Sequence, residues 1–550
     1  MKRFFSVEYR TSVPPRPLAT HACLEGLSRK LKENCGRNDG TTMDWKNKIL
    51  EKGSKILENP EVMRWLTDDR VMKVAEGLMD APERLKAAGK ILKNGYALPN
   101  VDPALDDDPP VGRASGASPS VAAPSAADPK GSEDMEESMS ERRSLANIGG
   151  KDIFEKAFKF TAADNARKRG IYPFFRPLDF SDGPEAEIKG KRVVMLGSNN
   201  YLGLTTHPKV REAAKAAIDK YGTSMTGSRL VNGSMRLHEE FEEKLADWFG
   251  TESALVFTTG YQVNLATLAA LLSNKQSVAV IDRNVHASLY DGVRLGMATG
   301  ARQVRYKHND ADSLDRALEK LTDAEGALVI TDGVFSAEGE IAHLDKIVPV
   351  VKKHGARLFV DDAHALGVIG PGGRGTSHHF GVQDDVDLMG GTFSKSFAST
   401  GGWLAGDRKV LDYIRHFAPS FMFAAAAAPT SVAAAMASHE VMQEEPWRIE
   451  KLHENFTYMR DNLRALGFEL GKTETAVIPI YIRQDLRTVL MWKDLLDDYG
   501  IYTNPFISPG VPPKSAMLRT SYMATHERHH LDKALEAFEK VGKKYGIIGK

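Results

Sequence analysis

One lysine in the sequence lies among small hydroxyl residues, in Gly391-Thr392-Phe393-Ser394-Lys395-Ser396, just after an apolar stretch at 386–389. A lysine at the end of a buried strand is partly removed from water, which lowers its pKa and makes its amine a nucleophile. The hydroxyls of Thr392 and Ser394 could hold a phosphate. Taken alone, the pattern also fits a surface-turn lysine, which is the commoner case.

A carboxylate follows a second apolar run, in Phe359-Val360-Asp361-Asp362-Ala363-His364. Because Asp361 comes directly after apolar residues, its charge is poorly solvated unless a cation lies beside it. A protonated pyridine nitrogen of a cofactor would be one such partner. A helix cap is the alternative interpretation, and Asp361 alone does not decide between the two.

Two further turns come after apolar runs. In Thr258-Thr259-Gly260-Tyr261 a glycine stands between a predicted strand and a predicted helix, where backbone N–H groups can bind a phosphate. His286, shortly after the run at 278–281, could stack its flat imidazole on a planar cofactor. Both signals are weak alone, since glycine is common in such turns and a structural histidine is at least as common as a functional one.

The elements that must position these residues form an α/β pattern. Residues 208–221 have helical spacing, and strand-length apolar runs at 254–257, 278–281, 327–330 and 358–360 alternate with polar stretches. Buried strands separated by helices predict a mostly parallel sheet. From about residue 409 the spacing changes, and strand-like segments at 476–482 and 517–523 predict a smaller α+β domain.

From about residue 170 to 545 the chain resembles the α-oxoamine synthases, pyridoxal 5'-phosphate (PLP) enzymes of the aspartate aminotransferase-like fold type I. The motifs that carry the resemblance extend over nearly the whole of this region. They are Gly197 to Gly203, Gly227-Ser228-Arg229, Asn232-Gly233, Thr259-Gly260-Tyr261, His286-Ala287-Ser288, Asp361 to His364, Gly391 to Lys395, Gly401-Gly402 and Leu518-Arg519.

The resemblance implies a role for each candidate site residue. Lys395 would bind PLP covalently and move the substrate's α-proton, and Asp361 would pair with the pyridine nitrogen. His286 would stack on the ring and help orient the amino acid, and His364 would bond the ring hydroxyl. The phosphate end would be held by Gly260, Tyr261, Thr392 and Ser394. The substrate carboxylate would be clamped by Arg519, with Asn200 near the bound amino acid.

The implied reaction is a decarboxylative condensation of an amino acid with an acyl-CoA, in a homodimer with shared active sites. Ser394-Lys395-Ser396, Tyr290-Asp291-Gly292 and Met491-Trp492 resemble the bacterial branch that joins L-serine to palmitoyl-CoA, giving 3-ketodihydrosphingosine for sphingolipid biosynthesis. The alternatives are the 8-amino-7-oxononanoate synthase, glycine C-acetyltransferase and 5-aminolevulinate synthase types. An ordinary aminotransferase and a non-catalytic regulatory subunit are two further alternatives, and the intact motif set disfavours both.

The sequence departs from the family pattern at Phe423 to Pro429, where alanines replace the usual Thr and Ser at Ala424 and Ala426. The family's hydroxyl at the position of Ala424 reaches the partner subunit's cofactor phosphate, so we expect weaker cofactor binding. A second departure, Asp362 in place of the usual glutamate, is expected to have little effect.

Composition limits the remaining choices. The 73 basic and 73 acidic residues give no net charge, which disfavours a nucleic-acid binder. With only two cysteines, the chain can have neither a disulfide framework nor a cysteine-rich metal site. The sequence has no apolar run of about 18 residues, so we expect no transmembrane helix. We therefore expect a cytoplasmic enzyme without a metal, with peripheral membrane contact left open.

The expected domains follow the changes in composition along the chain. They are a poorly ordered segment at 1–42, a small helical extension at 43–100, a flexible linker at 101–145, an N-terminal arm at 146–205, a PLP-binding large domain at 206–408 and a C-terminal small domain at 409–550.

Overall fold

The computed structural model describes residues 151–322, 325–512 and 514–549, all of which lie within the compact unit Asn100–Lys550. The predictions for 1–42, 43–100 and 101–145 lie outside the described residues.

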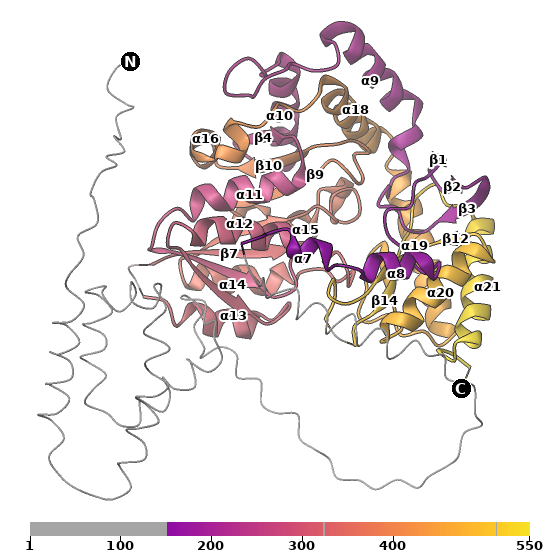
Figure 1. Cartoon of the computed structure of the whole chain (residues 1–550). Helices are drawn as coiled ribbons and strands as arrows, with labels where there is room; N and C mark the ends of the chain where they lie inside the picture. Colours follow the sequence, from indigo (N-terminus) through magenta and orange to yellow (C-terminus); the bar gives the residue numbers. More distant parts are fainter. Residues whose placement is uncertain (1–150, 323–324, 513, 550) are drawn as a thin grey trace, which may run out of the picture. The chain divides into compact units, whose positions relative to one another are not determined.

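The largest sheet has seven strands in the order β4-β10-β9-β8-β7-β5-β6 (Figure 1). Its strands are β4 (Ser253–Phe257), β5 (Ser277–Asp282), β6 (Arg302–Tyr306), β7 (Gly326–Asp332), β8 (Arg357–Asp361), β9 (Leu388–Thr392) and β10 (Gly402–Gly406). The strands from β9 to β6 pair in parallel, and β10 is antiparallel to both of its neighbours. The predicted mostly parallel α/β sheet is thereby confirmed.

Helices cover this sheet and explain its apolar strands, because every residue of β5 and β9 is buried. The helices of this region are α9 (Pro208–Tyr221), α10 (Arg236–Phe249), α11 (Gly260–Leu271), α12 (Ala287–Met297), α13 (Ala311–Leu318) and α14 (Leu344–Lys353). Glycine lets α12 lie close against α11, since a Cβ on Gly292 would be 2.8 Å from the carbonyl oxygen of Asn264.

The N-terminal part of the described chain forms a small second sheet, to which the later strand β12 (Ile501–Tyr502) also belongs. It contains α7 (Glu155–Phe158), α8 (Ala162–Lys168), β1 (Phe180–Asp182), β2 (Glu185–Ile188), β3 (Lys191–Met195) and the 3-10 turn η2 (Leu204–Thr206). The four-stranded order β1-β2-β3-β12 ends on β12, so this arm is joined to the C-terminal part of the chain.

The C-terminal part carries a three-stranded antiparallel sheet in the order β11-β14-β13. Its elements are α19 (Trp447–Ala465), β11 (Val477–Tyr481), α20 (Asp485–Asp497), β13 (Asn504–Phe506), β14 (Met517–Ser521) and α21 (Arg528–Lys544). The strands predicted at 476–482 and 517–523 are therefore present, each slightly shorter than expected.

The remaining helices lie between β8 and β9 or follow β10. Those between β8 and β9 are η3 (Pro371–Gly373), α15 (Thr376–His379) and η4 (Gln383–Asp385), and those after β10 are α16 (Arg408–Phe417), α17 (Pro419–Met422) and α18 (Pro429–Glu444). Because α18 packs against α9 and α10, and α16 against β4 and α11, these helices extend the seven-stranded unit past residue 409. The division of the catalytic region at 408 remains a proposal.

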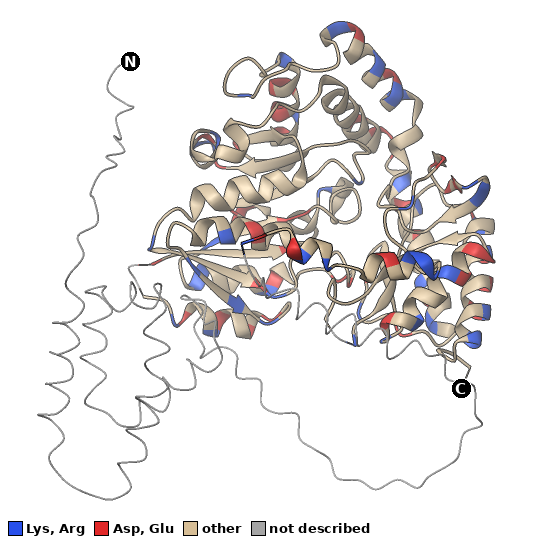
Figure 2. Ribbon diagram, viewed as in Figure 1, with Lys and Arg blue, Asp and Glu red and all other residues tan. Residues whose placement is uncertain are grey.

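Charges of both signs alternate along the outer helices, for example α9 and α21 (Figure 2). No described helix is long and apolar enough to cross a lipid bilayer.

Candidate active site

A cavity of about 210 Å³ lies at the carboxyl ends of β7, β8 and β9, where parallel α/β sheets bind their ligands. The N-termini of α11 and α12 close it from the side. Its walls are formed by Gly260, Tyr261, Asn264, His286, Ser288, Asp332, Val334, Asp361, Ala363, His364, Gly391, Thr392, Ser394 and Lys395. Eight of the ten residues predicted for the site line this one cavity, and Asn200 and Arg519 do not.

Lys395 lies three residues after β9, with a partly buried side chain that faces the cavity. Burial lowers the pKa of its amine to about 8, and the positive charge of Arg519 acts in the same direction. Asp361 and Asp332 oppose this shift without cancelling it. A substantial fraction of the amine is therefore neutral near physiological pH, as a nucleophile requires.

Asp361 ends β8 and begins a chain of hydrogen bonds that leads to His286. Asn264 on α11 donates from Nδ2 to Asp361 Oδ2 (2.7 Å) and to Ser288 Oγ (2.8 Å). Ser288 Oγ in turn lies 2.7 Å from His286 Nδ1. Burial lowers the pKa of His286, with Lys395 adding to the effect and Asp361 opposing it. The chain fixes the plane of the imidazole at the cavity wall.

Asp332 is a cavity residue that the sequence reasoning missed. It ends β7 and pairs in register with Asp361 at the end of β8, so two carboxyl groups lie side by side. Burial and the neighbouring Asp361 raise the pKa of Asp332 well above its usual range. Its oxygens accept the backbone N–H of His286 at 3.3 and 3.2 Å. The run 329–332 carried the same signal of an apolar strand followed by an aspartate that had identified Asp361.

His364 is buried, and its Nδ1 lies 2.7 Å from the hydroxyl of Tyr201. Burial lowers the pKa of His364 well below its usual range, and the positive charges of Lys395 and Arg519 add to the effect. The ring is therefore neutral, so Tyr201 can donate to Nδ1 and leave Nε2 as a donor. Tyr201 is a second residue that was missed, although it lies within one of the quoted motifs.

The N-terminus of α11 forms the end of the cavity that suits an anion. Thr259 caps the helix by accepting the N–H of Gln262 at 3.1 Å. A Cβ on Gly260 would lie 2.6 Å from Cβ of Thr392, so the close approach of helix and strand depends on glycine. Thr392 Oγ1 lies 2.9 Å from Ser394 Oγ. These hydroxyls and the first N–H groups of α11 make a phosphate-binding arrangement.

Tyr261, the second residue of α11, has a half-exposed ring beside His286, with ring centroids 6.2 Å apart. Its hydroxyl donates to Asp291 on α12. The contact fixes the outer edge of the phosphate end.

Arg519 on β14 is buried near Asn199 and Ser336, outside the lining of the cavity. Its Nε donates to the carbonyl of Ser336 (2.6 Å), Nη1 to Asn199 Oδ1 (3.1 Å) and Ser521 Oγ (2.9 Å), and Nη2 to Asn199 Oδ1 (3.1 Å). Among the described residues no carboxylate pairs with this guanidinium, so a buried positive charge is left for an anionic ligand.

Asn200 lies outside the residues that line the cavity, and its amide contacts the turn around η2. Its Nδ2 donates to Thr205 Oγ1 (2.9 Å), and its Oδ1 accepts the N–H of Leu204 (3.1 Å). Both ends of the amide are thus used in the turn around η2, and the neighbouring Asn199 is the residue that contacts Arg519. The role of Asn200 at the substrate remains a prediction.

The alanine segment at 424–428 lies next to the capped end of α11. Thr258 Oγ1 donates to the carbonyl of Ala425 at 2.7 Å, and Ala426 N–H donates to the carbonyl of Gly227. Asp362, the other departure, is buried and accepts the N–H of Thr376 at 2.9 Å.

The residues of the cavity fit PLP by the chemistry of their donors. The amine of Lys395 suits the aldehyde of PLP, and the carboxylate of Asp361 suits its ring nitrogen. The hydroxyls and N–H groups at the N-terminus of α11 suit its phosphate. Within the described residues, Oδ1 of the buried Asn264 also has no hydrogen-bond partner, as expected beside a ligand.

Comparisons with known proteins agree with this arrangement. The aminotransferase class I and II family model matches residues 191–538. A serine palmitoyltransferase of Sphingobacterium spiritivorum is 43% identical over 395 residues, which cover 72% of this chain and 98% of the relative. An 8-amino-7-oxononanoate synthase of Thermoanaerobacter pseudethanolicus is 38% identical over 386 residues, covering 70% of this chain and 96% of the relative.

Among solved structures, a high-resolution structure of SPT with PLP internal aldimine matches with a TM-score of 0.69 and 34% identity, covering 72% of this chain and all of that one. The expected fold type and cofactor are confirmed by this likeness together with the family match. The chain belongs to the aminotransferase class I and II family and, within it, to the PLP-dependent α-oxoamine synthases.

Proposed function

We propose that this enzyme condenses L-serine with a long-chain acyl-CoA, palmitoyl-CoA in the first instance, to give 3-ketodihydrosphingosine. The serine α-carbon loses its proton and forms a carbon–carbon bond to the thioester carbonyl, and the carbon–sulfur bond breaks to release CoA, whose sulfur takes up a proton. The bond to the serine carboxylate breaks to release CO2, and a proton takes its place.

The choice of serine and a long-chain acyl-CoA as substrates rests on the similar proteins. Four serine palmitoyltransferases are 40–43% identical to this chain, above the 37–38% of the 8-amino-7-oxononanoate synthases. The buried cation of Arg519, without a carboxylate partner among the described residues, supports binding of an amino acid through its carboxylate.

PLP, when bound, supplies an electron sink that stabilises negative charge on the α-carbon of the amino acid. Lys395 would hold the cofactor and carry the α-proton at Nζ, a role that its pKa of about 8 supports. Asp361 would keep a proton on the ring nitrogen, and His286 would stack on the ring. His364 would donate from Nε2 to the ring hydroxyl, since Tyr201 occupies its other nitrogen.

The remaining residues would orient the two ends of the ligands. Gly260, Tyr261, Thr392 and Ser394 would hold the phosphate end, and Arg519 the substrate carboxylate. Carboxylate placement decides which bond of the α-carbon lies perpendicular to the ring and therefore breaks. Four of the five N–H groups of Arg519 already contact protein oxygens, and the guanidinium also interacts with the Tyr201 hydroxyl, so a substrate carboxylate would compete with these partners for Arg519.

A substrate screen tests the proposal. Purified holoenzyme is incubated with serine, glycine or alanine and with short- or long-chain acyl-CoAs, and the release of CoA and CO2 is measured. We expect turnover with serine and palmitoyl-CoA, and none in Lys395→Ala, which also loses the visible absorption of lysine-bound PLP. Product from glycine but not from serine would contradict the serine assignment and favour another α-oxoamine synthase activity.

A homodimer is part of the same proposal. Large apolar side chains are exposed at Phe417 (61%), Phe423 (74%) and Val231 (73%), and their burial against a second subunit would support such an assembly. Sedimentation of the full chain should give twice the 60.5 kDa subunit mass. A monomer at micromolar concentration with full activity would contradict shared active sites. A cytoplasmic location stays a prediction.

A further inference from the structure

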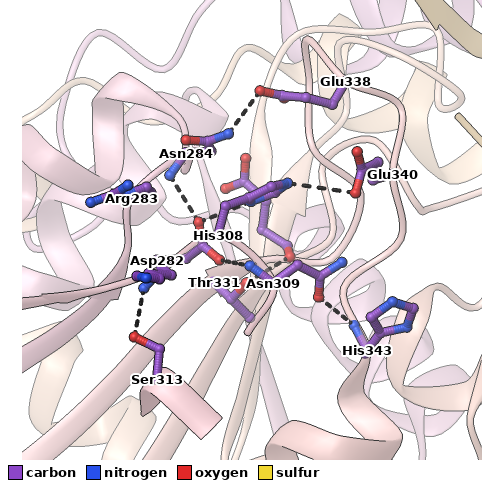
Figure 3. Close-up of polar contacts among 12 residues, drawn as sticks. Asp282, Arg283, Asn284, His308, Asn309, Ser313, Thr331, Glu338, Glu340 and His343 are labelled. Carbon is purple, nitrogen blue, oxygen red and sulfur yellow. Dashed lines mark hydrogen bonds and ion pairs between the residues drawn. The ribbon is translucent and has the colours of Figure 1, made fainter. Parts of the chain in front are cut away.

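A second cluster of titratable side chains lies behind the cavity wall, around the buried Asp282 at the end of β5 (Figure 3). Asp282 Oδ1 accepts the N–H of Asn284 (2.8 Å) and lies 3.2 Å from His308 Nδ1. Its Oδ2 accepts the N–H of Asn309 at 2.7 Å. The end of β5 and the loop after β6 are thus joined through one carboxylate.

The other side of His308 faces a hairpin at 333–342, which follows β7. Its backbone pairs Val334 with Ile341 and turns at Gly339, whose φ is +68°. His308 Nε2 lies 3.7 Å from Oε2 of Glu340, and its ring stands edge-on to Phe335 with centroids 4.3 Å apart.

Two asparagines fasten the same hairpin. Asn284 Nδ2 donates to Oε1 of Glu338 at 3.0 Å, and Asn309 Nδ2 donates to the carbonyl of Ile341 at 2.9 Å. The cluster therefore ties the hairpin to the loops after both β5 and β6, and Figure 3 shows the dashed lines from Asn284 to Glu338 and from His308 to Glu340.

The opposite side of the hairpin contributes to the active site. Val334 lines the cavity, and the carbonyl of Ser336 accepts the Nε–H of Arg519 at 2.6 Å. Asp332, just before the hairpin, accepts the N–H of His286. A displacement of this hairpin would therefore move the acceptor that orients the guanidinium.

We propose that His308 is a positioning residue for the amino-acid substrate: held between Asp282 and Glu340, it fixes the 333–342 hairpin so that Ser336 sets the direction of Arg519. His308 touches neither cofactor nor substrate. The inference rests on the proposed function in one respect, that Arg519 binds the carboxylate of the amino acid.

The charges around His308 favour a protonated imidazole that bridges Asp282 and Glu340. Burial acts to lower the pKa of His308, but Asp282 and Glu340, with Glu338 farther off, outweigh it and raise this pKa to about 10. His308 in turn holds the pKa of Glu340 below its usual range. Burial raises the pKa of Glu338, which faces Asn284. At neutral pH one positive ring therefore sits between two carboxylates on separate loops.

The test compares two ligands that differ only in the carboxylate. Serine and ethanolamine are titrated into holoenzyme, and binding is followed by the visible spectrum of the cofactor. In His308→Gln, which removes the charge, we expect the dissociation constant for serine to rise about tenfold, as for other residues that orient a ligand-binding group. Ethanolamine binding and cofactor affinity should change by less than about twofold.

His343→Gln is the matched control. His343 lies at the base of the same hairpin, but its backbone N–H, rather than its ring, makes the contact to Asn309 shown in Figure 3. It should bind both ligands like the wild type. Glu340→Gln removes the same ion pair from the hairpin side and should shift serine binding in the same direction, and it carries the test if His308→Gln does not fold.

The outcomes separate the inference from the proposed function. Serine binding unchanged in both His308→Gln and Glu340→Gln, or equal losses for serine and ethanolamine, would overturn the positioning role. A wild-type enzyme that turns over glycine instead of serine would overturn only the serine assignment, and glycine with methylamine would then replace the ligand pair. A lower melting temperature with an unchanged serine-to-ethanolamine ratio indicates a purely structural residue and also overturns the inference.

Discussion

Burial of the Lys395 amine should lower the free energy of unfolding of the PLP-free enzyme, compared with a variant that has an uncharged side chain at this position. The fall of its pKa from 10.5 to about 8 means that the folded chain binds the proton less tightly than the unfolded chain. At about 1.36 kcal/mol per pH unit, folding loses about 3 kcal/mol below pH 8. As pH rises from 8 to 10.5 the unfolded amine also loses its proton, and the penalty disappears.

Lys395→Met removes the charge and keeps a side chain of similar length and shape. We therefore expect apo Lys395→Met to be about 3 kcal/mol more stable than apo wild type at pH 7, and less than about 0.5 kcal/mol more stable at pH 10.5. The assay is urea unfolding of both apoproteins at pH 7, 9 and 10.5, at one protein concentration because a dimer's stability depends on it.

Lys244→Met is the control, since this lysine is ion-paired with Glu440 at the surface and its replacement should give no such gain. The reasoning is refuted if Lys395→Met is no more stable than wild type at pH 7, or if its gain is the same at pH 10.5. Holoenzyme should behave in the opposite way, since the variant cannot form the covalent bond to the cofactor that stabilises the wild type.

Three further predictions concern the ligands. Arg519→Lys keeps the positive charge but loses the planar guanidinium that contacts Ser336 and Asn199. The kcat/KM for serine should therefore fall about 30- to 1,000-fold, with cofactor affinity unchanged. A loss below threefold would contradict the role of Arg519 in binding the carboxylate. Gly260→Ala brings a methyl group 2.6 Å from Cβ of Thr392 and should weaken PLP binding at least about tenfold by fluorescence titration, whereas Gly250→Ala at an open helix end should not. Ala424→Thr should tighten PLP binding, measured in the same titration, and no gain would show that the family's cross-subunit hydroxyl is not missed here.

The sequence predicted the large sheet well because its strands are buried on both faces. The runs at 254–257, 278–281, 327–330 and 358–360 became β4, β5, β7 and β8, and the helix predicted at 208–221 has the same bounds in the structure. Such strands carry no competing polar signal. In contrast, β6 has the sequence Arg302-Gln303-Val304-Arg305-Tyr306 and lies at the sheet edge, where polar residues are allowed, and it was not predicted.

Site residues that directly follow a buried strand were predicted from the sequence. Site residues whose place depends on tertiary contacts were missed. Asn264 is one turn inside α11 and resembles any polar helix residue in sequence, yet it links Asp361 to Ser288. Asn199 and Asn200 are adjacent, and only the fold around η2 shows which amide faces Arg519. Neither the hairpin at 333–342 nor His308 has a pattern that reveals its partners, because those partners lie on other loops.

The origin of Arg519 has a consequence for how such enzymes diverge. The amine, carboxylates and imidazoles of the cavity come from the seven-stranded sheet and its loops, whereas Arg519 comes from β14 of the three-stranded sheet. If Arg519 binds the substrate carboxylate as proposed, substitutions in the smaller sheet can therefore alter amino-acid binding while the residues that hold the cofactor stay unchanged. The hairpin at 333–342 links the two sheets at this point, because the carbonyl of Ser336 accepts the Nε–H of Arg519, so changes in either sheet must preserve this hydrogen bond to keep the guanidinium in place.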